Sequence, residues 1–173
     1  MVRRIQPTDA GALRELRLRA LLSDPAAFGS SYEQEVHLPT EDWERRAIEA
    51  STGGRQSLFL VQTSEGFAGM AGAYTPSDKA SVRHLYGMWV APAARSAGAG
   101  QQLVEAIIRW SIEAGAEDVQ LWVVDDNLGA RRLYQRAGFL ETGISQPLPS
   151  NPTVTETLME LHLGSTGSEK TGG

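Results

Sequence analysis

The sequence predicts a mixed α/β fold built on a mixed, largely antiparallel sheet of six to seven strands, flanked by about four helices. Helical and strand-like apolar patterns follow one another in the order β-α-α-β-β-β-α-β-α-β-β. The short gap between 57–62 and 66–74 is typical of a hairpin. A helix between the strands at 81–90 and 118–124 instead indicates a central β-α-β unit. The predicted fold therefore has antiparallel hairpins on either side of that unit.

One strand and two helices are expected in the first third of the chain. Residues 2–6 read as a strand, and Thr8 is placed to cap the helix that follows. The apolar stripe of that helix consists of Leu13, Leu16, Leu21 and Leu22. Residues 25–38 lack a clear period and are expected to form a loop with one turn. A second helix starts at 39–42, where acidic residues suit the positive end of the helix dipole, and ends before Gly53.

Strands and helices alternate more regularly in the remaining sequence. Helices are predicted at 98–113 and 127–137, and a proline-containing loop at 146–152. We expect residues 1–163 to form a single domain and residues 164–173, which are poor in apolar side chains, to be a disordered tail. The predicted strands lie at 57–62, 66–74, 81–90, 118–124, 139–144 and 153–162.

Composition excludes several classes of function. The chain has no cysteine, which rules out disulfides, thiolate metal sites and cysteine nucleophiles. Its three histidines, His37, His84 and His162, lack ligand spacing, so we expect no metal site. A net charge of −5 without a basic stripe argues against nucleic-acid binding. No apolar run approaches the roughly 20 residues of a membrane span and no signal peptide is recognisable, so we expect a cytoplasmic protein that binds no membrane.

A glycine-rich turn after the strand at 81–90 is the first candidate site. Gly98 and Gly100 open an apolar-faced helix, where glycine lets the backbone approach a ligand and the first N–H groups lack helical partners. With the positive end of the helix dipole, these donors form a site suited to a pyrophosphate. Arg95 adds a charged donor on the same side.

This turn alone has three interpretations: a plain connection between a strand and a helix, a Walker-type nucleotide site or a dinucleotide site. No Gly-Lys-Ser/Thr follows, so a Walker site is excluded. A dinucleotide site is closer, because Asp125 ends the next strand. However, Leu103 stands in place of the third glycine, and the loop from Val90 to Gly98 is long for that fold. These two differences argue against a nicotinamide-dependent oxidoreductase but do not exclude one.

A second block spans residues 127–139, Asn-Leu-Gly-Ala-Arg-Arg-Leu-Tyr-Gln-Arg-Ala-Gly-Phe. Asn127 is a good helix cap, and Leu133 and Tyr134 share a helix face with two alanines. The plain interpretation is an amphipathic helix with Tyr134 in the core. A buried phenol nevertheless needs a partner for its hydroxyl, which makes Tyr134 a candidate for chemistry.

Together the two blocks resemble the signature of the GNAT acyltransferase superfamily. The pattern runs Arg95-x-x-Gly98-x-Gly100, then Asn127-x-x-Ala130-x-x-x-Tyr134-x-x-x-Gly138-Phe139. The element order is similar to that of the family from about residue 2 to residue 163. The resemblance implies an acetyl-CoA-dependent N-acetyltransferase whose sheet is splayed around a CoA groove.

The resemblance also implies roles for individual residues. The backbone of Arg95, Ser96, Ala97, Gly98, Ala99, Gly100 and Gln101 would hold the CoA pyrophosphate. Met88, Trp89 and Val90 would pair with the pantetheine arm, and Asn127 would contact the cofactor. Tyr134 would point at the thioester sulfur. A phenol with a pKa of about 10 is protonated at neutral pH and suits a general acid for a leaving thiolate, whose conjugate acid has a pKa of about 8.5.

The sequence alone does not identify the general base. Some relatives place a glutamate on the strand before the glycine-rich turn, and His84 occupies that position here. An imidazole with a pKa near 6.5 is suited to deprotonate an amine. A strand histidine is also common as a packed or surface residue. Glu33, Glu35, Glu141 and water are the alternatives.

The acceptor site is implied to lie near residues 28–35 and 146–152. Phe28, Tyr32, Glu33 and Glu35 would form an aromatic, acidic pocket for a cationic amine, unless the two aromatic residues only anchor a loop. The expected reaction is direct transfer of an acetyl group to a primary amine of an unidentified acceptor: a small amine, an antibiotic or a protein amine. Alternatives are an inactive CoA-binding regulatory domain and the oxidoreductase. Relatives are often dimers, so the resemblance also raises the expectation of a homodimer.

Overall fold

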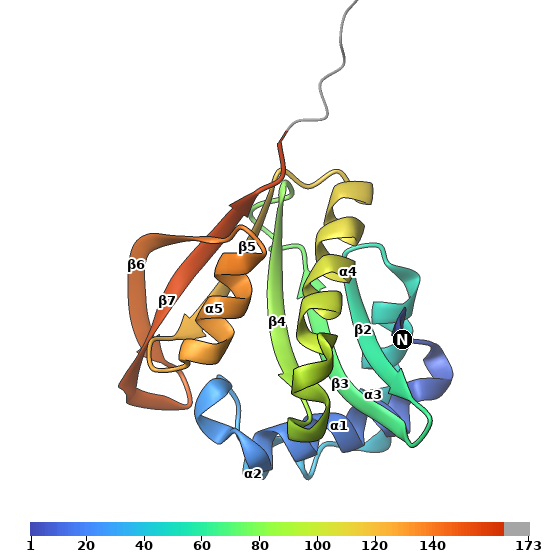
Figure 1. Cartoon of the computed structure of the whole chain (residues 1–173). Coiled ribbons are helices and arrows are strands. Elements are labelled where there is room, and N and C mark those ends of the chain that lie inside the picture. Colours follow the sequence, from blue (N-terminus) through green and yellow to red (C-terminus); the bar gives the residue numbers. More distant parts are fainter. Residues whose placement is uncertain (165–173) are drawn as a thin grey trace, which may run out of the picture.

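The computed structural model of the chain describes residues 1–164, which form a seven-stranded sheet with helices on both faces (Figure 1). The strand order is β1-β2-β3-β4-β5-β7-β6, and among these described strands only the β4–β5 pair is parallel. This arrangement confirms the predicted mixed, largely antiparallel α/β class. The strands are β1 (Val2–Arg4), β2 (Gln56–Thr63), β3 (Gly66–Tyr74), β4 (Val82–Val90), β5 (Asp118–Val124), β6 (Leu140–Leu148) and β7 (Asn151–His162).

Two apolar cores lie on opposite faces of the sheet. The helices are α1 (Ala10–Ser23), α2 (Tyr32–Glu35), α3 (Thr40–Thr52), α4 (Ala99–Glu113) and α5 (Leu128–Arg136). Helices α1 and α3 pack on β2 and β3 around Leu16, Trp43 and Leu60. Helices α4 and α5 cover the other face around Leu103 and Ile107. No helix within residues 1–164 is long and apolar enough to span a membrane.

The sheet opens between β4 and β5. These strands pair only where Val82–Leu85 lies beside Asp118–Leu121. Beyond that point the β3–β4 register shifts, and Gly87 has a φ of +63°, a left-handed conformation that favours glycine. β5 continues beside β7, whereas β4 turns away from β5 (Figure 1). The end of β4 therefore keeps an edge with backbone groups that no neighbouring strand uses.

The start of the first helix differs from its prediction. Thr8 does not cap α1, because Pro7–Asp9 forms a separate 3₁₀ turn and Asp9 is the residue before the helix. The Asp9 carboxylate accepts hydrogen bonds from the Gln6 amide at 2.7 Å and from Arg3. Leu22 is 61% exposed and does not join the apolar stripe. At about 100° per residue, position 22 is rotated away from the face that holds Leu16.

The predicted loop at 146–152 is wrong, because most of it belongs to the β6–β7 hairpin. Pro147 fits within β6 because this is an edge strand, where a missing N–H can face away from the sheet. Pro152 lies in β7 before residue 156, where pairing with β5 begins, so it interrupts no ladder on that side. Of the expected tail at 164–173, all residues after Gly164 lie outside the described part of the chain.

Candidate active site

The glycine-rich turn leads into the N-terminus of α4. Gly98 has a φ of +74° and directly precedes the helix, so glycine is required there by backbone conformation. Gly100 has a different role, since an added Cβ would lie 3.2 Å from Leu133 of α5. A cavity of about 510 Å³, the outer cavity, lies beside the exposed first turn of α4. Its lining includes Arg95, Gly98, Gly100, Gln101, Leu133 and Arg136.

Arg95 connects this turn to the end of α1 through hydrogen bonds. Its Nε donates to the Val90 carbonyl at 2.8 Å, and its Nη2 donates to the Asp24 carboxylate at 2.9 Å. Asp24 also accepts from Trp89 Nε1 at 2.8 Å and from Ser23 at 2.8 Å. Burial opposes ionisation of Asp24, but the hydrogen bonds from Trp89 and Ser23 and the charge of Arg95 outweigh it and lower its pKa. The guanidinium therefore fixes the loop and still borders the cavity.

A second cavity of about 350 Å³, the middle cavity, continues from the outer one along the open edge of β4. The two share Arg95, Gly100, Leu133 and Arg136. Asn127 caps α5 by accepting the Ala130 amide at 3.2 Å. Besides the shared residues, the lining includes Asp24, Met88, Trp89, Val90, Asn127 and Gly129. Most of the cofactor-binding residues expected from the sequence thus lie along one groove.

Some residues of this groove had no signal in the sequence. Asp24 and Arg136 become part of it only through the packing of α1 and α5 beside the turn. Of the expected contacts in the turn, Ala97 is exposed and Ala99 is buried beneath the helix start. The backbone of Ser96 lies within the 3₁₀ turn Pro92–Ala97.

Tyr134 borders a third, small cavity of about 80 Å³, the inner cavity, where β4 and β5 separate. Its side chain is 5% exposed, and its ring packs edge-on against Phe139 with centroids 5.9 Å apart. Burial raises the pKa of Tyr134, so the phenol is protonated throughout the neutral range. Its hydroxyl has no hydrogen-bond partner within residues 1–164. The lining also includes Phe28, Leu85, Tyr86, Gly87, Met88, Trp122, Val123, Val124 and Asn127.

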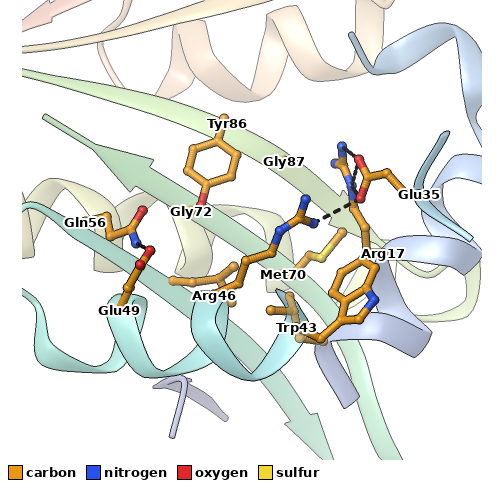
Figure 2. A pocket seen from close by; sticks show the side chains of 12 residues that line it. Arg17, Glu35, Trp43, Arg46, Glu49, Gln56, Met70, Gly72, Tyr86 and Gly87 are labelled. Atoms are coloured by element: carbon orange, nitrogen blue, oxygen red, sulfur yellow. Dashed lines mark hydrogen bonds and ion pairs between the residues drawn. The ribbon is translucent and has the colours of Figure 1, made fainter. Parts of the chain in front are cut away.

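A fourth cavity of about 300 Å³, the arginine cavity, lies on the other side of β4 between α1, α3 and the sheet (Figure 2). Tyr86 and Gly87 border both this cavity and the inner cavity. The Tyr86 ring lies over Gly72, where an added Cβ would be 2.6 Å from Tyr86 Cζ. The polar lining is Arg17, Glu35, Arg46, Glu49, Gln56 and Tyr86, and the apolar lining is Leu13, Trp43, Leu58 and Met70.

Glu35 does not make this cavity acidic in the way the sequence suggested. Arg17 donates to its carboxylate at 2.7, 3.1 and 3.2 Å, and Arg46 donates at 3.2 Å. Burial opposes ionisation of Glu35, but the hydrogen bonds and charge of Arg17, aided by Ser30 and Arg46, hold its pKa below the usual range. The carboxylate is therefore ionised and already bound by two guanidinium groups.

The other expected acceptor residues are spread more widely. Phe28 is buried, borders the inner cavity and lies 4.9 Å from the Arg17 guanidinium. Tyr32 is half-buried and packs against the α1–α3 core, and Glu33 is exposed. Neither Tyr32 nor Glu33 lines the arginine cavity. Phe28 and Glu35 are thus the two expected residues that reach the site.

Two of the candidate bases, His84 and Glu141, do not line any of the four cavities. His84 is half-buried on β4, two residues before Tyr86, and its ring packs on Tyr74 at a centroid distance of 5.3 Å. Burial lowers the pKa of His84 and keeps the imidazole neutral at pH 7. Glu141 lies on β6 and is paired with Arg131 of α5.

Comparison with known proteins agrees with this geometry. Residues 17–139 match the model of the "Acetyltransferase (GNAT) family". The chain belongs to the GNAT acetyltransferase family. The chain is 28% identical over 131 residues to an uncharacterized N-acetyltransferase of Bacillus subtilis, YhfO, in a match covering 71% of this chain and 88% of the relative. As a GNAT acetyltransferase it is an acyltransferase, and the oxidoreductase interpretation of the Gly98–Gly100 turn no longer applies.

Solved structures share the fold of this GNAT chain. The structure of yncA of Salmonella typhimurium, named as an acetyltransferase and solved with its cofactor acetyl-CoA, has a TM-score of 0.80 at 17% identity, covering 99% of this chain and 98% of that one. A GNAT-family acetyltransferase of Streptococcus pneumoniae has a TM-score of 0.78 at 24% identity, with coverages of 95% and 99%. At these identities the likeness establishes the shared GNAT fold.

Proposed function

We propose that this protein transfers an acetyl group from acetyl-CoA directly to the primary amine of an acceptor in the arginine cavity. The observation that carries the proposal is that two cavities on opposite sides of β4 share Tyr86 and Gly87 in their lining. A donor bound along the outer, middle and inner cavities and an acceptor bound on the other side of β4 would meet at this point. Direct transfer also suits a chain that has no cysteine to carry the acyl group.

The lining of the groove supports acetyl-CoA as the donor. The free amides at the start of α4 and the positive dipole end suit a pyrophosphate, and Arg136 adds a cation from α5. The unpaired edge of β4 after Gly87 offers backbone groups to an extended pantetheine arm. Acetyl-CoA supplies the thioester that an amine attacks. Tyr134 would then donate a hydrogen bond and its proton to the departing sulfur.

His84 is proposed as the base that accepts the amine proton through water. His84 lies two positions before Tyr86, which corresponds to about 6.6 Å along β4, too far for direct contact but within reach of a bridging water. Only neutral imidazole can accept the proton. Because burial lowers the pKa of His84, the acidic fall in kcat/KM should have its midpoint below about 6.5. His84→Gln should abolish this fall and lower kcat/KM at pH 7; an unaltered profile would assign proton removal to water alone.

Binding and turnover test the proposed function separately. Acetyl-CoA at a hundred times its dissociation constant should add about 2.7 kcal/mol of stability. In a chain of this size this corresponds to a melting-temperature rise of roughly 5–10 °C, and NADH should give none. Release of free CoA thiol should then be measured against a panel of primary amines. A thermal shift without turnover on any amine would favour the inactive CoA-binding domain. No shift with acetyl-CoA would refute the assignment of the groove.

A further inference from the structure

The arginine cavity contains more hydrogen-bond donors than its own acceptors use. A guanidinium has five N–H donors. Arg17 engages Glu35 through Nε and Nη2, and Arg46 does so through Nη1 alone. Within residues 1–164, Arg17 Nη1 and the Nε and Nη2 of Arg46 have no hydrogen-bond acceptor. Figure 2 shows the Arg46 guanidinium between Glu35 and Tyr86.

One of these spare donors, on Arg17, lies close to Gly87, which borders both the arginine cavity and the inner cavity. Arg17 Nη1 is 3.7 Å from the position that a Cβ on Gly87 would occupy. Both guanidinium groups are held against aromatic rings, Arg17 at 4.9 Å from the Phe28 centroid and Arg46 at 4.7 Å from that of Trp43. Their planes are therefore held in place before a ligand arrives, which lowers the entropy lost on binding an oxyanion.

The charge at this end of the cavity is positive. Arg17 and Arg46 together carry two positive charges, and Glu35 supplies one negative charge between them. The other acidic residue, Glu49, is exposed and accepts a hydrogen bond from Gln56 at 2.8 Å. Figure 2 shows the Glu49–Gln56 pair on the opposite side of the cavity from Glu35. Among residues 1–164, a cationic acceptor would thus meet no free carboxylate in the cavity lining near Gly87.

The rest of the cavity indicates the size and polarity of the ligand. A volume of about 300 Å³ is at the small end of ligand pockets and suits a small molecule. Side chains of α1, α3, β2 and β3 form an apolar floor. They are Leu13, Trp43, Leu58 and Met70.

We propose that the acceptor is a small amine with a carboxylate beside its amino group: an α-amino acid with an apolar side chain. The spare donors of Arg46 and Arg17 would bind the carboxylate, a geometry that guanidinium groups match well. The apolar side chain would lie over the floor, and the amino group would face Gly87. This inference rests on the proposed function and adds the class of acceptor to it.

The test compares amino acids with the amines left when their carboxylate is removed: phenylalanine with phenethylamine, leucine with isoamylamine, and methionine with 3-(methylthio)propylamine. For the native protein, kcat/KM should favour the amino acid in at least one pair by about tenfold or more, the effect of a hydrogen bond to a charged group. Arg46→Gln should lower kcat/KM for the amino acid of each pair by a larger factor than kcat/KM for its decarboxylated amine, and should thereby remove that preference. Arg46 is the better target because its single bond leaves Glu35 held by Arg17.

Arg45→Gln is the matched control. Arg45 is the neighbouring arginine on α3, is 60% exposed, pairs with Asp42 and does not line the cavity. This variant should keep the preference of the native protein. Equal or better turnover of the decarboxylated amines by the native protein, or a preference that survives Arg46→Gln, would overturn the inference while leaving the proposed acetyl transfer intact.

A binding measurement separates failure of the inference from failure of the proposed function. In the presence of CoA, 3-phenylpropionate has the carboxylate and the apolar group but no amine to acetylate. It should raise the melting temperature of the native protein and of Arg45→Gln, and not that of Arg46→Gln. If this pattern appears while no amine is acetylated, the carboxylate site stands and the acetyl transfer fails. If 3-phenylpropionate does not stabilise the native protein, the carboxylate site is refuted.

Discussion

Replacing Tyr134 with phenylalanine should lower kcat by about 100-fold, the lower range for loss of a general acid, and leave the affinity for CoA essentially unchanged. The substitution removes only the hydroxyl of Tyr134, a residue that borders the inner cavity. The ring would keep its edge-on packing against Phe139, so no void is created in the core. Because burial raises the pKa of Tyr134, the native enzyme keeps this proton across the neutral range, and the defect should be constant there. Steady-state kinetics from pH 6 to 9 would measure it.

The control for this variant is Tyr74→Phe. Tyr74 is 40% exposed on β3, and its hydroxyl borders none of the four cavities. Its loss should leave kcat unchanged. Melting temperatures of both variants should match that of the native protein. A full native rate in Tyr134→Phe would exclude the acid role, whereas a fall in both rate and melting temperature would assign Tyr134 a structural role instead.

Local sequence patterns were sufficient to predict most of the fold. The apolar periodicity and the positions of the glycines place the helices and most strand boundaries within a few residues, as for β5 and for α3, which ends just before Gly53. The errors in the predicted fold arise where contacts between elements distant in sequence determine the local structure. Pro147 reads as a loop residue, and only the edge position of β6 makes a strand acceptable there. The left-handed Gly87 that opens the sheet also had no local signal within its strand.

The candidate site was predictable where its function depends on backbone geometry or on one short motif. The turn at Gly98 and the cap at Asn127 are such local features, and the structure places both beside the groove. The charge of the acceptor side was not predictable in this way. Glu35 reads as an acidic pocket residue, but its partners lie 18 positions earlier, at Arg17, and 11 positions later, at Arg46. Only the packing of α1, α2 and α3 brings these three side chains together.

Glu35 should also be important for stability. In Glu35→Gln a neutral amide would replace the carboxylate between Arg17 and Arg46 and leave two positive charges close together. Removing one partner of a fully buried ion pair costs about 3–5 kcal/mol. Here the side chains of Glu35, Arg17 and Arg46 are 8%, 17% and 43% exposed, so partial solvation should reduce the loss to about 2 kcal/mol. Thermal unfolding at pH 7 should then show a decrease of roughly 4–8 °C.

The matched control is Glu33→Gln on the same short helix, where the carboxylate is exposed and a change within about 0.5 kcal/mol is expected. The pH dependence gives a second test. Because the folded-state pKa of Glu35 is depressed, its contribution is fully present above the unfolded value of about 4.3 and is lost as the pH falls through the lower folded value. The difference in melting temperature between the native protein and Glu35→Gln should therefore be constant from pH 7 to 5 and shrink below about pH 4. A difference that persists unchanged in acid would show that shape and packing at Glu35, rather than its charge, stabilise the junction of α1, α2 and α3.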